Sequence, residues 1–99
     1  MIEKQIIKLM LSKDFYTEYK GQVSRNVFQG SFGSLYDTVQ KAHDKYDADI
    51  SIDELYSLHT TVFNPALTRA AKEQFHELLE DIKETQEPSK QIADDIIKI

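Results

Sequence analysis

Apolar residues at the start of the chain recur with the spacing of a helix, while Lys4 and Lys8 fall on the opposite side. The apolar set comprises Ile2, Ile6, Ile7, Leu9, Met10 and Leu11. A stripe this wide is typical of a helix that several neighbours cover. The pattern therefore predicts a first helix over residues 2–11, broadly buried.

Two further segments repeat every three to four residues. Phe15, Tyr16 and Tyr19 indicate a short aromatic helix, which Gly21 can end. After a polar stretch, the clearest amphipathic pattern of the chain is made by Phe32, Leu35, Tyr36, Val39, His43 and Tyr46. It predicts a long helix over residues 32–46.

Boundary signals place the next two helices. Ser51 and Glu54 form a capping-box pattern, which predicts a helix that begins at Ile52 and ends near Phe63. Asn64 and Pro65 combine an N-cap residue with a proline at a first helical position, so the next helix is expected to begin at residue 65. A tight corner between the two helices follows.

The helix after this corner separates apolar from acidic positions. It is expected to bury Leu67, Ala71, Phe75, Leu78 and Ile82 and to expose Glu73, Glu77, Glu80, Asp81 and Glu84. Pro88 breaks it, and a last helix presents Ile92, Ile96 and Ile99, with Ala93 and Ile97 adjacent. The whole pattern predicts an all-α fold: one domain over residues 1–99, a compact orthogonal bundle of about five to six short helices.

Composition limits where this domain works. The chain has 99 residues, no cysteine and a net charge of −5. No apolar run approaches the ~20 residues needed to span a bilayer, and the first residues lack the features of a secretory signal. We expect a cytoplasmic protein with no membrane contact. Because the last helix ends with neither glycine nor a polar tail, we also expect the chain to be a fragment of a longer polypeptide.

No catalytic or cofactor-binding pattern is present. Gly21, Gly30 and Gly33 are not followed by lysine at the spacing of a P-loop, so no nucleotide site is expected. His43, His59 and His76 fall on three different predicted helices and form no metal-binding pair. The acidic residues are expected to form a solvated face. The sequence therefore predicts a chain that is not an enzyme and that holds no metal or cofactor.

Because no catalytic or cofactor-binding pattern is present, the predicted role of the chain is contact with other macromolecules. Tyrosine is frequent in interface hot spots, and an exposed acidic helix can meet a basic partner. The predicted partner-binding residues are Tyr16, Tyr19, Glu77, Glu80, Asp81 and Glu84. Direct nucleic-acid binding is an alternative and would require Lys4, Lys8, Lys13, Lys20 and Arg25 to share one patch against the negative background.

An ordered set of segments resembles the N-terminal head domain of DnaB-like replicative helicases, above all those of T4-type phages. These segments are residues 2–11, Asp14-Phe15-Tyr16, Val27-Phe28 with Phe32, Leu35-Tyr36 and Val39, and residues 50–55, and they extend over nearly the whole chain. The resemblance rests on apolar spacing and one capping box, so it carries no functional residue over. It implies a helical head attached to an ATPase domain in a hexameric ring that unwinds DNA.

The resemblance implies that the head mediates self-association and contact with primase or another replication protein. The chain itself contains no ATPase motif, so ATP-dependent unwinding would belong to a longer parent, with Walker motifs downstream. Nucleic acid would be bound only through that parent. The alternative is a free-standing acidic adaptor, which binds a host or phage protein through residues 67–82.

Overall fold

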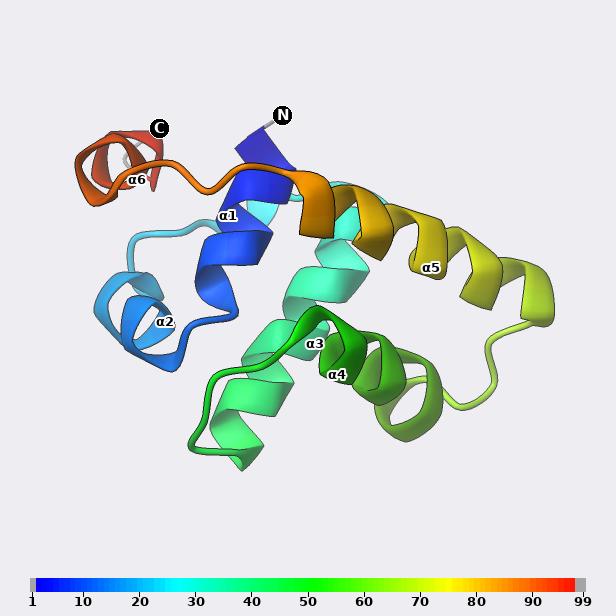
Figure 1. Cartoon of the computed structure of the whole chain (residues 1–99). Coiled ribbons are helices and arrows are strands. Elements are labelled where there is room, and N and C mark those ends of the chain that lie inside the picture. Colours follow the sequence, from blue (N-terminus) through cyan, green and yellow to red (C-terminus); the bar gives the residue numbers. More distant parts are fainter. Residues whose placement is uncertain (1, 98–99) are drawn as a thin grey trace.

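The helices are organised around the first one, α1 (Ile2–Met10), in a computed structural model that describes residues 2–97. The other α-helices are α2 (Lys13–Tyr19), α3 (Ser31–Lys45), α4 (Ile52–Ser57), α5 (Arg69–Glu84) and α6 (Lys90–Ile97). Helix α1 packs against α2, α3, α5 and α6 (Figure 1). All regular structure in residues 2–97 is helical, so the predicted all-α bundle is confirmed.

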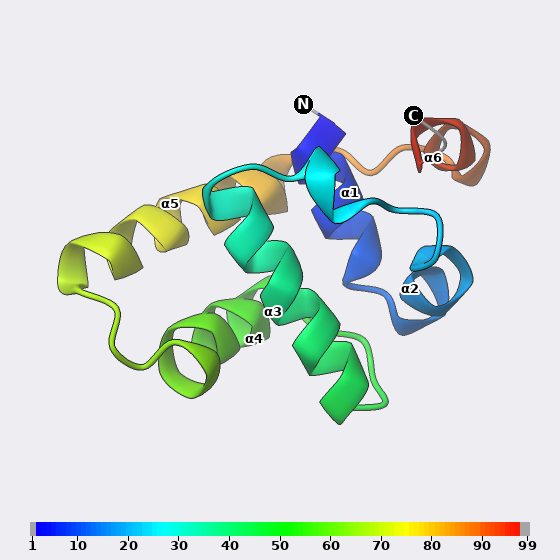
Figure 2. The ribbon, with the colours of Figure 1, turned by 180° about the vertical axis from the view of Figure 1, so that it is seen from behind.

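Two short irregular helices connect these elements. A 3-10 turn, Arg25–Val27, precedes α3, and a π-helical segment, Leu58–Phe63, continues α4 without a break. Figure 2 shows α3 crossing the back of the molecule, with the α4 segment beside it and α5 above. The π-helical segment packs against α3, while α4 packs against α5.

One hydrophobic core joins residues from most of the elements. Its fully covered members include Ile7 and Met10 of α1, Tyr36 of α3 and Leu55 of α4. Burial of such a side chain contributes about 1.5–3 kcal/mol, so this shared core is what holds the helices together. The apolar face predicted over residues 2–11 is confirmed in α1, whereas the face predicted over residues 32–46 is confirmed in α3 only for Leu35, Tyr36, Val39 and His43.

The capping box at Ser51 is also confirmed. The backbone N–H of Glu54 donates to Ser51 Oγ at 3.1 Å, and the backbone N–H of Ser51 donates to Glu54 Oε1 at 2.9 Å. Both donors would otherwise lack partners at the start of α4. Ile50, the residue before the cap, is buried in the core.

The predicted start of the next helix is wrong. Helix α5 begins at Arg69, and its N-cap is Thr68, whose Oγ1 accepts the Ala71 N–H at 3.1 Å. The Asn64 side chain instead donates to the His59 carbonyl at 2.9 Å, at the end of the π-helical segment. Thr68 rather than Asn64 therefore caps the helix, and Pro65 lies in a turn before it.

The apolar face of the last helix is also corrected. Ala93 and Ile97 are buried and Ile96 is half-buried, whereas Ile92 is 56% exposed. The face that meets the bundle is therefore shifted by one residue from the predicted one, and it packs against α1. Ile99, the third member of the predicted face, lies outside the described residues.

Candidate interaction surfaces

The acidic face of α5, defined as Glu73, Glu77, Glu80, Asp81 and Glu84, is open to solvent at four of its five positions. Glu80 is half-buried, contrary to the predicted exposure, because its neighbour Leu79 turns into the core. Arg69 lies 3.5 Å from Glu73, and Lys4 lies 3.6 Å from Asp81. Exposed pairs of this kind contribute little stability, so the face keeps its negative character.

A hollow of about 460 Å³ lies beside this face, between the start of α3 and the middle of α5. Its lining residues are Gln29, Ser31, Phe32, Gln74, Glu77, Leu78 and Asp81. Phe32 and Leu78 are only half-buried, although the apolar pattern assigned both to the core. The structure thus adds apolar surface to two of the predicted partner-binding residues, Glu77 and Asp81.

Tyr16 and Tyr19, the other predicted partner-binding residues, are buried, each only 5% exposed. The Tyr16 ring stacks on His43 with centroids 4.4 Å apart, and burial, followed by the nearby Asp44 charge, raises the pKa of Tyr16. The Tyr19 ring lies 4.5 Å from Phe15, and its hydroxyl donates to Asp94 Oδ1 at 3.1 Å. The structure therefore places these tyrosines apart from the acidic face, with little ring surface open to a partner.

The basic residues considered for nucleic-acid binding each have a partner within the chain. Lys8 Nζ donates to the carbonyls of Lys83, at 2.9 Å, and Thr85 at the end of α5, and Lys13 Nζ donates to the His43 carbonyl of α3 at 2.7 Å. A positive charge at a helix C-terminus is favourable. These two ammonium groups thus join helices rather than forming an open patch.

The remaining basic candidates are also engaged. Arg25 Nε lies 2.9 Å from Asp37, and its Nη1 donates to the Phe28 carbonyl at 3.0 Å. The hydrogen bond to Asp37 is the main reason why the pKa of Arg25 is raised. Lys4 faces Asp81, and Lys20 Nζ lies 5.9 Å from the centre of the Tyr16 ring.

The three histidines lie in separate surroundings. His43 Nε2 lies 2.6 Å from the Met10 carbonyl, and His59 Nδ1 lies 2.7 Å from Thr38 Oγ1. Both side chains are buried, whereas His76 is exposed. Within residues 2–97 no group of three or more His, Asp or Glu residues is arranged to hold a metal ion.

A second apolar hollow, the Tyr46 pocket, lies where the chain turns from α3 into α4. It is lined by Tyr46, Ala48, Asp49, Ile50, Asp53, Glu54, Ser57 and Leu58. The sequence pattern assigned Tyr46 to the buried face of its helix, but its ring is 39% exposed. In the sequence, the acidic residues between positions 44 and 54 could have indicated the polar rim at this turn.

Comparison with protein-family models, with curated proteins and with solved structures finds no match for this chain. No helix in residues 2–97 combines the length and the apolar character needed to cross a membrane. The arrangement of the described residues offers surfaces for macromolecular contact: the acidic face of α5 with its hollow, and the Tyr46 pocket.

Proposed function

We propose that this chain is the non-catalytic N-terminal head of a DnaB-like replicative DNA helicase, which mediates ring assembly and contact with primase or another replisome protein. The observation that carries the proposal is the way in which the helicase-like segments converge. Residues from each of them, including Met10, Tyr16, Phe28, Tyr36 and Leu55, meet in one core. The pattern on which the resemblance rests then has a single structural reason, the packing of one helical bundle, which supports the proposal.

The acidic face of α5 supports the contact part of the proposal. Glu77 and Asp81 border the apolar surface of Phe32 and Leu78, and an apolar centre with a polar rim is the usual anatomy of a protein interface. A replication protein with a basic docking surface would be steered towards this face. Such a head would work in the cytoplasm of the bacterial cell in which replication takes place.

A titration of the fluorescently labelled chain with the primase encoded in the same genome tests this proposal. Saturable binding with a Kd of roughly 1–10 µM, read from fluorescence anisotropy, is the expected result for a transient replisome contact. Absence of binding up to about 100 µM primase would contradict the primase contact.

A free-standing adaptor is the second candidate, favoured by the same acidic face and hollow on α5. An adaptor would leave primase unbound and would capture a host or phage protein outside replication. Cross-linking in a lysate of the source cells, with identification of the captured protein by mass spectrometry, separates the two functions. Recovery of primase or another replisome component favours the helicase head.

A further inference from the structure

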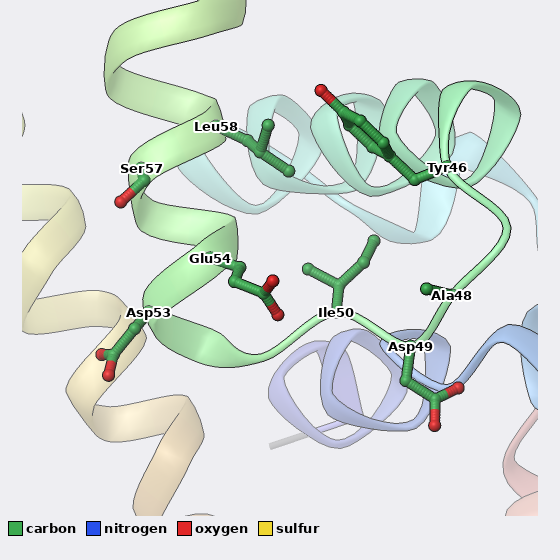
Figure 3. Close-up of a pocket in the computed structure, with 8 residues that line it drawn as sticks. All are labelled: Tyr46, Ala48, Asp49, Ile50, Asp53, Glu54, Ser57 and Leu58. Atoms are coloured by element: carbon green, nitrogen blue, oxygen red, sulfur yellow. The ribbon is translucent and has the colours of Figure 1, made fainter.

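The Tyr46 pocket has a volume of about 500 Å³ and a wall that is mainly apolar. Figure 3 shows the side chains of Tyr46, Ala48, Ile50 and Leu58 turned towards the same space. Asp49 and Asp53 point away from it and form its rim. Apolar surface framed by charged residues is characteristic of a contact site for another molecule.

Tyr46 gives this pocket an exposed aromatic wall. Within residues 2–97, the only other large hydrophobic side chains with comparable exposure are Val62 and Ile92, and neither lines the pocket. Tyrosine offers a rigid ring with a polar tip, which suits it to anchor a partner at low entropic cost. The pocket therefore provides a hydrophobic anchor point for a partner, formed by a side chain that is not part of the core.

The charged residues that line the pocket are all acidic, and the nearby Lys45 ammonium lies outside the lining, 5.5 Å from the centre of the Tyr46 ring. Asp49, Asp53 and Glu54 line the pocket, and none of the eight lining residues is basic. Glu54 is held in place by the capping box, where its Oε1 accepts the Ser51 N–H at 2.9 Å. These hydrogen bonds with Ser51 lower the pKa of Glu54, so a fixed carboxylate stands beside Ile50 at neutral pH (Figure 3).

We propose that the Tyr46 pocket docks a basic amphipathic segment of a partner protein, whose apolar side chain enters the hollow while its Lys or Arg residues extend beyond it, to Glu54 and to the outward-facing Asp53. Charge complementarity selects this occupant, because basic side chains match the acidic rim and an apolar anchor matches the wall. A second copy of this chain matches it less well, since each copy carries a net charge of −5. The inference is independent of the helicase proposal and concerns a surface apart from the acidic face of α5.

The probe for this site is a synthetic peptide of about 15 residues with leucine and arginine at helical spacing, compared with a peptide in which glutamate replaces arginine. Backbone amide shifts of the isotope-labelled chain, recorded by NMR during titration, map the contact. The expected shifts concentrate in residues 46–58 and occur with the arginine peptide only.

Two exposed positions provide variants that keep the core intact. Tyr46→Ser removes the aromatic wall and is expected to weaken peptide binding roughly tenfold. Asp53→Asn removes one rim charge and is expected to weaken it about threefold. Ile92→Ala removes a more exposed apolar side chain on α6 and serves as the control, with binding changed by less than about twofold.

Three results would overturn the proposal. Shifts concentrated on α5 would show that the arginine peptide merely follows the negative charge of the chain. Equal binding of the glutamate peptide would exclude charge selection. Unchanged affinity in both Tyr46→Ser and Asp53→Asn, with unchanged far-ultraviolet circular dichroism, would exclude the pocket itself.

Discussion

At the scale of single residues, the two buried histidines are held in the neutral form. The Met10 carbonyl can only accept, so His43 Nε2 carries the hydrogen, and His43 Nδ1 has no partner among the described residues. His59 Nε2 is likewise buried without a partner. Burial is the main reason why the pKa of each histidine is lowered, with nearby lysines, Lys13 for His43 and Lys41 for His59, adding to the effect.

These lowered pKa values predict an acid-labile fold. The unfolded chain takes up protons near the ordinary histidine pKa of 6.5, whereas the native chain resists them. The stability that the two neutral histidines contribute is therefore complete above pH 6.5 and is lost as the pH falls below it. Urea unfolding between pH 8 and 5.5 should show the free energy of unfolding decreasing only below about pH 6.5. The Glu54 carboxylate acts in a separate window, because its ordinary pKa is 4.5 and its native pKa is lower still.

Variants separate the buried histidines from the exposed one. His59→Asn keeps a polar group near Thr38 but cannot titrate, so it should flatten the pH dependence while lowering overall stability. His76→Gln changes an exposed ring and should lower the free energy of unfolding by less than about 0.5 kcal/mol. A flat profile in the parent chain would contradict the assignment of neutral buried histidines.

Lys8 provides a second test at residue scale. Its ammonium group joins α1 to the last carbonyls of α5, so Lys8→Met should lower the free energy of unfolding by about 1 kcal/mol. Lys20→Met, which removes an exposed ammonium 5.9 Å from the centre of the Tyr16 ring, should change it by less than about 0.5 kcal/mol. Equal losses in urea titrations of the two variants would show that the carbonyl contacts contribute nothing.

At the scale of elements, the two capping signals of the sequence had different outcomes. Ser51 and Glu54 need only each other and the local backbone, so the pattern sufficed to place the start of α4. Asn64 has a competing use, since its side chain reaches back to the His59 carbonyl and ring. That use depends on a π-helical segment which no periodicity in the sequence indicated, and Thr68 caps α5 at Arg69 instead.

A pair of substitutions tests this boundary. Thr68→Ala removes the N-cap of α5 and should cost about 1 kcal/mol of stability. Pro65→Ala lies in the turn before it and should cost less than about 0.5 kcal/mol. Chemical denaturation of both variants gives the comparison, and the reverse order would return the helix start to residue 65.

The positions of the candidate contact residues show which features the sequence could predict and which it could not. Periodicity located the acidic face of α5 because a helix face is a local property. It could not show that Lys8 meets carbonyls 75 and 77 residues away or that the Tyr16 ring stacks on His43, since both depend on how helices dock. The exposure of Tyr46 was also not predicted, because α3 ends at Lys45 and Tyr46 adopts an extended backbone conformation beyond the helix.

At the scale of the whole molecule, charge is arranged in two ways. Basic groups such as Lys8, Lys13 and Arg25 form contacts within the chain, whereas the acidic face of α5 is left open to solvent.

Glu77→Lys, a charge reversal on the acidic face of α5, should therefore weaken primase binding, by roughly fivefold in the anisotropy titration. Asp95→Lys makes the same charge change on an exposed position of α6 and should leave it within about twofold. Equal weakening by both would mean that only net charge matters.

The proposal that this chain is a helicase head that contacts primase is tested most directly by competition. The measurement is primer synthesis by primase in the presence of the replicative helicase from the same genome, with this chain added in increasing excess. We expect the stimulation by helicase to decline to the level of primase alone, while the basal activity of primase stays constant. Undiminished stimulation at saturating amounts of the chain would contradict the helicase-head function.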